Sequence, residues 1–405
     1  MPRPGPPFLI EPADITVEGG KNTIVYAWGS LAEGTLATAV QLLTPGTKRV
    51  APLPCVCVGW VTMKAIVYRA TGDPSVLELV HRQVRDPGPG EVRVRVVVSA
   101  VNPTDWKSRR GARPGAPLAF PEVVPNQDGA GTVDAVGPGT SGFEIGDRVW
   151  VALAAYQRAD GGTAQEFTVL PVERVFALPD NAGFDVGASL GVPAITAHRA
   201  LTVAEDGPRR LHPGALASKV VLVAGGAGAV GHAAVQLAKW AGAVVITTIS
   251  SPEKEALVRS AGAHHVINYK ESDPAAEIRR IAPDGVDVIV EVAPAQNAEL
   301  DLAVIRNRGS VAVYANNGGD FVNLDVRKNF SLNVRYQFVL LYTVGMEAVR
   351  AAAEDIKAAL ADGALPVGGP AGLPLHRFGL ADTAAAHAAV EGSIVGKVLI
   401  DVSDE

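Results

Sequence analysis

A glycine-rich segment, Gly226-x-Gly228-x-x-Gly231, is the part of this sequence best suited to binding a phosphate-bearing ligand. Glycines at this spacing allow a tight turn and let backbone N–H groups approach a pyrophosphate. The segment follows an aliphatic run at 219–223, typical of a buried strand, and opens 230–241, where apolar residues recur at helical spacing. A helix beginning here adds unpaired N–H donors and the positive end of its dipole. The spacing and its context therefore predict a dinucleotide-binding turn.

The residues after the next expected strand indicate which dinucleotide binds. A fold that prefers NAD places Asp or Glu at the end of this strand, where the carboxylate binds the ribose 2′-hydroxyl. Here the strand, 244–248, ends without an acid and is followed by Ser250, Ser251 and Lys254. Hydroxyls and an ammonium suit a 2′-phosphate, whereas Glu253 should point outward at the start of a helix. We therefore predict NADPH as the cofactor, although Lys254 as a solvated helix residue stays an open alternative.

Cysteine and histidine usage argues against a metal centre. The two cysteines, Cys55 and Cys57, both precede Met63, so no thiolate-based zinc site can form in the remainder of the chain. The histidine pair His264 and His265 lies at a loop-to-strand junction without a set of supporting carboxylates. We predict no bound metal. So few cysteines also fit a reducing, cytoplasmic location.

Composition excludes several other classes of protein. At 405 residues the chain has room for two domains, and 48% hydrophobic with 19% charged residues is typical of globular proteins. A net charge of −6 and the lack of a basic stripe argue against nucleic acid as the main partner. The apolar runs are of strand length, so we expect no transmembrane span and no membrane partner.

The first part of the patterned region is typical of β-structure. Val92, Val94 and Val96 alternate with Arg93 and Arg95, which places the valines on one face of a strand. Further short strands between Pro/Gly turns are expected at 64–69, 76–84, 131–136, 148–153 and 164–169, and a short helix at 103–110. These features predict a β-rich, barrel-like domain.

From about residue 186 the pattern changes to alternating helices and strands. After a helix at 186–204, strands are expected at 220–224, 244–248, 265–269, 286–292 and 310–314, with helices at 230–241, 252–260 and 295–305. Such alternation predicts a parallel, doubly wound sheet and hence an α/β fold. The last elements, helices at 346–362 and 381–389 and a strand at 397–402, have no neighbouring partner strand, so we expect them to fold back onto the first domain.

Residues 1–62 differ from the rest of the chain. They contain several prolines and much glycine, and the apolar run at 50–61 is broken by Pro52 and Pro54. A clean strand pattern begins only at Met63. Three interpretations stay open: a start codon assigned too far upstream, a disordered extension, or a small accessory module.

Several segments occur together in an order found in one protein family. They are Val-Asn-Pro-Thr-Asp-Trp-Lys at 101–107, Asp-Gly-Ala-Gly-Thr-Val at 128–133, Gly-Asp-Arg-Val at 146–149, Gly-Thr-Ala-Gln-Glu-Phe at 162–167, the glycine segment, Ser-Pro-Glu-Lys at 251–254, Gly-Ala-His-His-Val-Ile-Asn-Tyr at 262–269 and Gly-Lys-Val at 396–398. With them the chain resembles the zinc-independent quinone oxidoreductases, the zeta-crystallin-like branch of the medium-chain dehydrogenase/reductase superfamily, from Met63 to about Val402.

The resemblance implies a domain organisation. Residues 63–185 and 341–405 would form a GroES-like catalytic domain, and 186–340 a Rossmann domain that binds NADPH. The cofactor would lie in the cleft between them. The family is usually dimeric or tetrameric, so a homodimer or homotetramer is expected, with strands near 310–341 available for pairing.

The resemblance also assigns roles to single residues. Asn102 stands where zinc-dependent relatives have a catalytic cysteine and would line the nicotinamide end of the cleft, and Thr196 lies in a segment that approaches the cofactor. Lys107 stands where many quinone reductases have a tyrosine, which is a departure from the family. The cofactor-binding residues implied are Gly226, Gly228, Val230 and Gly231 for the pyrophosphate, Lys254 and Tyr269 for the 2′-phosphate, and Tyr314, Asn316, Asn317 and Lys397 nearby.

The expected reaction is hydride transfer from NADPH to a quinone. Without zinc as a Lewis acid, the oxyanion charge that develops must meet hydrogen-bond donors, for which Asn102, Lys107, Tyr156 and Thr196 are the candidates. Simpler roles stay open, since Asn102 would also cap a short helix and Lys107 would also suit a solvated turn. An enoyl or 2-alkenal reductase is the alternative enzyme, and a non-catalytic NADPH-binding sensor or crystallin-like protein is the alternative outside enzymes.

Overall fold

The computed structural model describes residues 25–28, 31–32, 35–36, 39–42, 62–113 and 115–403. The chain divides into two compact units, Met1–Thr62 and Met63–Glu405. In the first unit, strand β1 (Val25–Trp28) pairs antiparallel with β4 (Ala39–Leu42), and β2 (Leu31–Ala32) pairs with β3 (Thr35–Leu36). The open question about residues 1–62 is not answered by these short strands, and Cys55 and Cys57 lie outside the described residues.

The second unit begins with a mostly antiparallel sheet of seven strands. Their order is β11-β9-β8-β7-β19-β18, with β10 also paired to β7. The strands are β7 (Glu91–Val101), β8 (Asp128–Val136), β9 (Arg148–Val151), β10 (Phe167–Pro171), β11 (Val175–Ala177), β18 (Leu375–Gly379) and β19 (Lys397–Asp401). A separate pair is formed by β5 (Thr62–Val67) and β6 (Glu78–Gln83).

Strand β7 shows why this sheet forms. The alternation predicted for it places Val92, Val94 and Val96 in the interior, each at most 1% exposed, where Val92 and Val94 pack in one cluster with Val133 and Val149. Its far end pairs with β19, the last strand of the chain. The expectation that the C-terminal strand folds back onto the first domain is therefore confirmed.

The middle of the second unit is a parallel sheet of six strands in the order β14-β13-β12-β15-β16-β17. The strands are β12 (Val220–Ala224), β13 (Val244–Ile249), β14 (His265–Asn268), β15 (Val286–Glu291), β16 (Ile305–Val313) and β17 (Arg335–Phe338). The order reverses beside β12, so loops after β12 and β15 diverge and open a crevice at this edge, where ligands bind in such folds. The predicted α/β class is confirmed.

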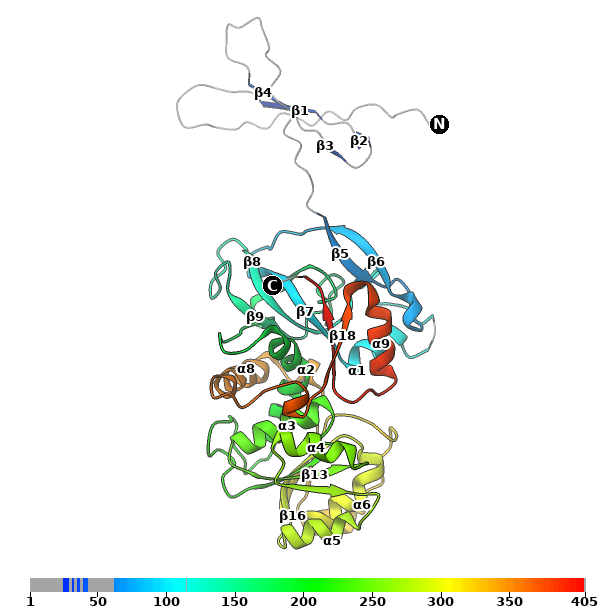
Figure 1. The fold of residues 1–405 in the computed structure, drawn as a ribbon, viewed down its shortest axis with the longest axis vertical. Helices are drawn as coiled ribbons and strands as arrows, with labels where there is room; N and C mark the ends of the chain where they lie inside the picture. Colours follow the sequence, from blue (N-terminus) through cyan, green and yellow to red (C-terminus); the bar gives the residue numbers. More distant parts are fainter. Residues whose placement is uncertain are drawn as a thin grey trace, which may run out of the picture. The chain divides into compact units, whose positions relative to one another are not determined.

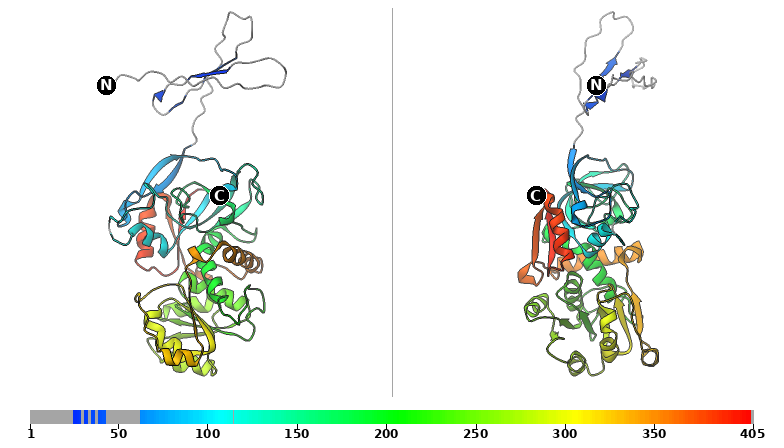
Figure 2. Two further views of the ribbon diagram at one scale, coloured as in Figure 1. Left: turned by 180° about the vertical axis from the view of Figure 1, so that it is seen from behind. Right: turned by 90° about the vertical axis from the view of Figure 1, so that its right-hand side faces the viewer.

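Helices surround and join the two sheets. They are α1 (Pro103–Arg110), α2 (Phe184–Leu201), α3 (Ala229–Trp240), α4 (Glu253–Ala261), α5 (Pro274–Ile281), α6 (Pro294–Val304), α7 (Val326–Ser331), α8 (Met346–Ala361) and α9 (Thr383–Glu391), with short 3₁₀ turns η1 (Pro74–Val76), η2 (Val172–Arg174), η3 (Leu341–Thr343), η4 (Gly369–Ala371) and η5 (Leu380–Asp382). Figures 1 and 2 show the first sheet, with the red C-terminal elements, at one end of this unit and the parallel sheet at the other. Helix α2 contacts both β8 and α3, so it links the two parts.

Helix α2 contains a kink that matters for the site. Gly191 has non-helical backbone angles (φ −26°, ψ −105°), and Pro193 lies two residues further on. A proline in a helix interior removes a backbone donor and clashes with the preceding turn, so the helix bends here. The turn that follows the kink carries Thr196.

Sequence patterns missed α5, α7, β11, β17 and β18. Strands β17 and β18 lie at the edges of their sheets and most of their side chains are partly exposed, so they lack the buried period that reveals a strand. Helix α5 has Asp273 as its N-cap, accepting from two backbone N–H groups, and Pro274 at its first position, so its sequence does contain the signals of a helix start.

Candidate functional site

A cavity of about 410 Å³ opens at the crevice beside β12. It is lined by Val101, Asn102, Pro103, Trp106, Lys107, Gly225, Ala227, Gly228, Ala229, Thr248, Ile249, Ser250, Lys254, Tyr269, Asn317, Val390, Ser393, Ile394, Val395, Gly396, Lys397 and Val398. The loop after β12 and the end of β13 form one wall, and the start of α1 and the segment before β19 form the other. In the described part of the chain the lining includes three lysines and no acidic residue, so the cavity favours an anionic ligand.

The glycine loop brings the N-terminus of α3 to this cavity. A Cβ on Gly231 would lie 2.5 Å from the carbonyl oxygen of Gly225, and one on Gly226 would lie 2.2 Å from Oγ1 of Thr247. Both positions therefore require glycine for close packing, whereas Gly228 lines the cavity itself. Because the first N–H groups of a helix have no intrahelical partner, the loop can present several donors to a phosphate.

Three predicted residues meet at the end of β13. Lys254 Nζ donates to Ser250 Oγ at 2.7 Å, and the half-exposed Tyr269 lines the same end of the cavity. Glu253 is exposed, and a hydrogen bond from the Ser251 side chain lowers its pKa. The outward orientation expected for Glu253 is confirmed, and the cationic and hydroxyl groups fit a 2′-phosphate.

At the opposite end, Asn102 belongs to a buried polar network. Its Oδ1 accepts from Lys397 Nζ at 2.6 Å, and its Nδ2 donates to Asp128 Oδ2 at 2.6 Å. Its backbone N–H donates to Asp105 Oδ2 at 2.7 Å. All four side chains are at most 3% exposed. Asn102 is the N-cap residue of α1, as the simpler interpretation predicted, and its side chain also bonds to Lys397 and Asp128.

Burial dominates the electrostatics of this network. Burial, and to a smaller extent the neighbouring Asp128 carboxylate, raises the pKa of Asp105 to about 8. Burial also raises the pKa of Asp128 and lowers that of Lys397, while attraction between these two groups, 3.8 Å apart, opposes both shifts. The ammonium of Lys397 is engaged by Asn102, although the residue lines the cavity as predicted for a cofactor contact.

The other catalytic candidates occupy different places. Lys107 is exposed, lines the cavity, and lies over the Trp106 ring at 5.9 Å from its centroid. Tyr156 packs against Tyr342, with ring centroids 5.0 Å apart, and Thr196 is buried in α2. Neither Tyr156 nor Thr196 lines the cavity.

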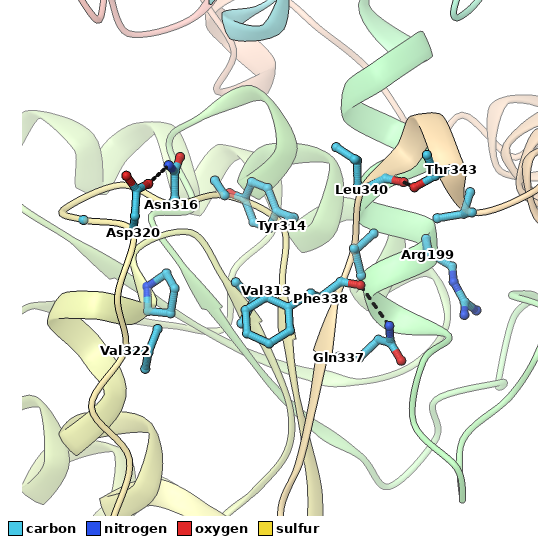
Figure 3. Close-up of a pocket in the computed structure, with 15 residues that line it drawn as sticks. Arg199, Val313, Tyr314, Asn316, Asp320, Val322, Gln337, Phe338, Leu340 and Thr343 are labelled. Atoms are coloured by element: carbon cyan, nitrogen blue, oxygen red, sulfur yellow. Dashed lines mark hydrogen bonds between the residues drawn. The ribbon is translucent and has the colours of Figure 1, made fainter. Parts of the chain in front are cut away.

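A second cavity, of about 510 Å³, lies at the ends of β16 and β17. Figure 3 shows Tyr314 and Asn316 on the loop after β16, where Asn316 donates to Asp320, and Leu340 and Arg199 on the opposite side of the cavity, the latter from α2. Burial raises the pKa of Tyr314. The structure thus separates Tyr314 and Asn316 from Asn317, which lines the first cavity.

Of the predicted site residues, the first cavity brings together Asn102, Lys107, Gly228, Ser250, Lys254, Tyr269, Asn317 and Lys397, whereas Tyr156, Thr196, Gly226, Val230, Gly231 and Ser251 line neither cavity. Sequence reasoning missed Asp128, Thr248 and the loop 393–395 as parts of the site. Asp128 carried one usable signal, since a charged residue comes directly before Gly129, Ala130 and Gly131, a run of small residues at the start of a strand.

The donor set fits a phosphorylated dinucleotide rather than a metal. The described residues contain no group of three or more His, Cys, Asp or Glu side chains that could hold a metal ion. The glycine loop, the lysines and Ser250 instead supply the neutral and cationic donors that phosphates require.

Comparisons with known proteins show to which class of proteins the chain belongs. Residues 88–180 match the family model described as alcohol dehydrogenase GroES-like domain, and residues 229–360 match the one described as zinc-binding dehydrogenase. Together with the fold, these matches define a medium-chain dehydrogenase/reductase.

Individual relatives narrow the assignment. The chain is 35% identical to quinone oxidoreductase of Mus musculus over 269 residues, which cover 65% of this chain and 77% of the relative. It is 32% identical to quinone oxidoreductase of Sus scrofa over 317 residues, which cover 77% of this chain and 91% of the relative. The chain belongs to the zinc-independent quinone oxidoreductase branch of the superfamily, as the motifs predicted.

Solved structures agree with this assignment. Quinone oxidoreductase of Pseudomonas syringae aligns with a TM-score of 0.70 at 27% identity, covering 84% of this chain and 99% of the other. Mycobacterial Rv1454c complexed with NADPH aligns with a TM-score of 0.69 at 30% identity and the same coverage. Among the described helices, none is long and apolar enough to cross a membrane.

Proposed function

We propose that this chain is an NADPH-dependent quinone reductase. The observation that carries the proposal is the first cavity, which has the glycine loop and the Ser250–Lys254 pair at one end and the Asn102 network at the other. The quinone oxidoreductases of mouse and pig among its relatives, and the NADPH complex of the similar mycobacterial protein, support both the substrate class and the cofactor.

Each end of the cavity has a separate task. The N-terminus of α3, with Gly228, would hold the pyrophosphate, and Lys254, Ser250 and Tyr269 would hold the 2′-phosphate. NADPH supplies a hydride when bound. Asn102 would donate a hydrogen bond at the reacting end, and solvent would supply the proton to the reduced quinone oxygen. Reduced quinone oxygens are stabilised phenolates, so strong electrophilic assistance is unnecessary.

The roles of the remaining candidates are also proposals. Lys107 lies where it could meet an acceptor at the open side of the cavity. Tyr156 and Thr196 would act through neighbours, because neither lines the cavity. Tyr314, Asn316 and the loop 316–319 would approach the cofactor from the second cavity, and Ser251 and Val230 would shape the backbone beside the phosphates.

We propose the predicted domain division for the second unit, with 63–185 and 341–405 as the catalytic domain and 186–340 as the cofactor domain. It is supported by the pairing of β19 with β7 and by the separate parallel sheet.

We also propose a homodimer. Strand β17 is a sheet edge, and exposed apolar side chains gather there, with Phe338 65% and Leu340 58% exposed. Small numbers of cysteines favour the cytoplasm as its location.

Steady-state oxidation of NADPH tests the function. Wild-type protein is expected to turn over 1,4-benzoquinone, with NADPH preferred to NADH, and to show little activity on a 2-enal. Turnover of the 2-enal alone would refute the quinone assignment. Tight binding of NADPH, measured by fluorescence quenching, without turnover of any acceptor would identify a sensor instead.

A further inference from the structure

The amide of Asn102 is held from two sides by groups of opposite hydrogen-bonding character. Lys397 Nζ donates to its oxygen at 2.6 Å, and Asp128 Oδ2 accepts from its nitrogen at 2.6 Å. An ammonium only donates and a carboxylate only accepts. Turning the amide over would place its NH₂ group against Lys397 and its oxygen against Asp128, so both contacts would become repulsive.

This arrangement leaves one N–H group of the amide unused. The described residues provide no second acceptor for Asn102 Nδ2, and Asn102 lines the cavity. The fixed orientation therefore reserves one N–H for a bound ligand. An amide free to turn over would present its oxygen there part of the time, which would repel a developing negative charge.

Asp128 also contacts the kink in α2. Both of its oxygens lie 2.9 Å from the backbone nitrogen of Val192, which donates to them. The neighbouring Gly191 makes this approach possible, because a Cβ there would lie 2.0 Å from Asp128 Oδ1. One buried carboxylate thus joins β8, α1 and α2 beside the cavity.

We propose that Asp128 is a positioning residue for hydride transfer: it keeps the Asn102 amide turned so that its unused N–H faces the reacting end of the cavity, and it fixes that amide to the kink of α2. The proposal rests on the proposed function, since it needs a reaction at this end of the cavity. It goes beyond that function by giving a role to a residue that does not itself line the cavity and acts through Asn102, which does.

If Asp128 had a purely structural role, the effect of its replacement on activity would depend differently on Asn102. If the carboxylate only stabilised the fold, its replacement would lower activity by the same factor whether or not Asn102 is present. If it acts through Asn102, its replacement should have little effect once that amide has been removed. A double-mutant cycle distinguishes the two.

Asp128→Asn is the informative variant, because asparagine has nearly the same size as aspartate and its oxygen can still accept from the Val192 N–H. It replaces the second acceptor oxygen with an NH₂ donor, so the side chain no longer only accepts hydrogen bonds. We expect it to lower kcat with 1,4-benzoquinone at least about tenfold, since one oriented donor to a developing oxyanion is worth roughly 100-fold or more. The Kd of NADPH from fluorescence quenching should change less than about threefold. In the Asn102→Ala background, Asp128→Asn should change kcat less than about twofold.

Asp134→Asn is the matched control, because Asp134 lies in the same strand but pairs with Arg93 and does not line the cavity. It should leave kcat unchanged. Equal losses from Asp128→Asn in both backgrounds, or wild-type kcat in a folded Asp128→Asn protein, would overturn the proposal.

Thermal unfolding of each variant establishes that it is folded. Should Asp128→Asn fail to fold, Lys397→Gln tests the same idea, because it removes the donate-only partner from the other side of the amide. The expected cycle is the same: loss of kcat in the wild-type background and almost none with Asn102→Ala, whereas equal losses refute the inference. A wild-type chain that turns over no quinone refutes the proposed function, and that result is seen before any variant is made.

Discussion

Lys254→Ala should reduce the preference for NADPH over NADH. In the structure Lys254 is partly exposed, lines the cavity and is oriented by a 2.7 Å hydrogen bond from its Nζ to Ser250 Oγ. No acidic residue among the described residues lines the cavity, so NADH gains no compensating contact. The substitution therefore removes an interaction that only the 2′-phosphate makes.

The magnitude follows from that geometry. A hydrogen bond to a charged group contributes about 1.5–3 kcal/mol, and partial exposure reduces this to about 1–2 kcal/mol. Since 1.4 kcal/mol corresponds to about a factor of ten, the Kd of NADPH should rise roughly 5- to 30-fold while that of NADH stays within about twofold. The kcat at saturating NADPH should change little, because the 2′-phosphate takes no part in hydride transfer.

The assay is fluorescence quenching by NADPH and by NADH, with KM from steady-state oxidation as a second measure. Lys270→Ala is the matched control, because Lys270 is exposed and near Tyr269 but does not line the cavity. Equal weakening of both cofactors by Lys254→Ala, or no weakening of either, would show that Lys254 is a solvated helix residue and that the 2′-phosphate is held elsewhere.

Three further outcomes are expected. Gly231→Val should lower stability by about 1–3 kcal/mol in urea unfolding, because its Cβ would lie 2.5 Å from the Gly225 oxygen; unchanged stability would contradict that packing. Lys107→Gln should lower kcat/KM for a sulfonated naphthoquinone about 3- to 10-fold more than for neutral 1,4-naphthoquinone if this ammonium faces the acceptor; equal effects on both place it in solvent. Burial raises the pKa of Asp355, but hydrogen bonds from His198 and other donors outweigh it and lower the pKa to about 2. With a discount for solvent screening, the carboxylate therefore stabilises the fold by about 1–2 kcal/mol above pH 4, and this is lost as the pH falls toward 2. The stability difference between wild type and Asp355→Asn should shrink over that pH range, and a constant difference would contradict the linkage.

Much of the fold could be predicted because its signals are local. The sequence predicts the bounds of β12 and α3 to within one residue of those in the structure, with the glycine loop between them. It also predicts both ends of α1 as the structure has them. Each of these elements carries its period, its turn residues or its first-position proline within a dozen positions. Edge strand β17 and strand β18 have no such internal period, because only pairing with a neighbour makes them strands.

The candidate site divides in the same way. The phosphate-binding half lies on consecutive elements, so Gly228, Ser250 and Lys254 could be identified from spacing and residue type alone. The other half is assembled from β8, α1, α2 and β19, which are separated by as much as 295 residues between Asn102 and Lys397. No pattern within one segment shows that Asp128 accepts from Asn102 or that Gly191 leaves room for its carboxylate.

By itself the sequence determined the α/β class, the dinucleotide turn and the preference for a 2′-phosphate, because periodicity, glycine spacing and the missing acid after β13 are properties of short segments. Only the tertiary structure decided which way the Asn102 amide is turned. That orientation depends on the buried ammonium of Lys397 and the buried carboxylate of Asp128, which lie on strands far apart in the sequence. Because the ammonium only donates, the carboxylate only accepts and water is excluded, only one orientation of the amide satisfies both groups.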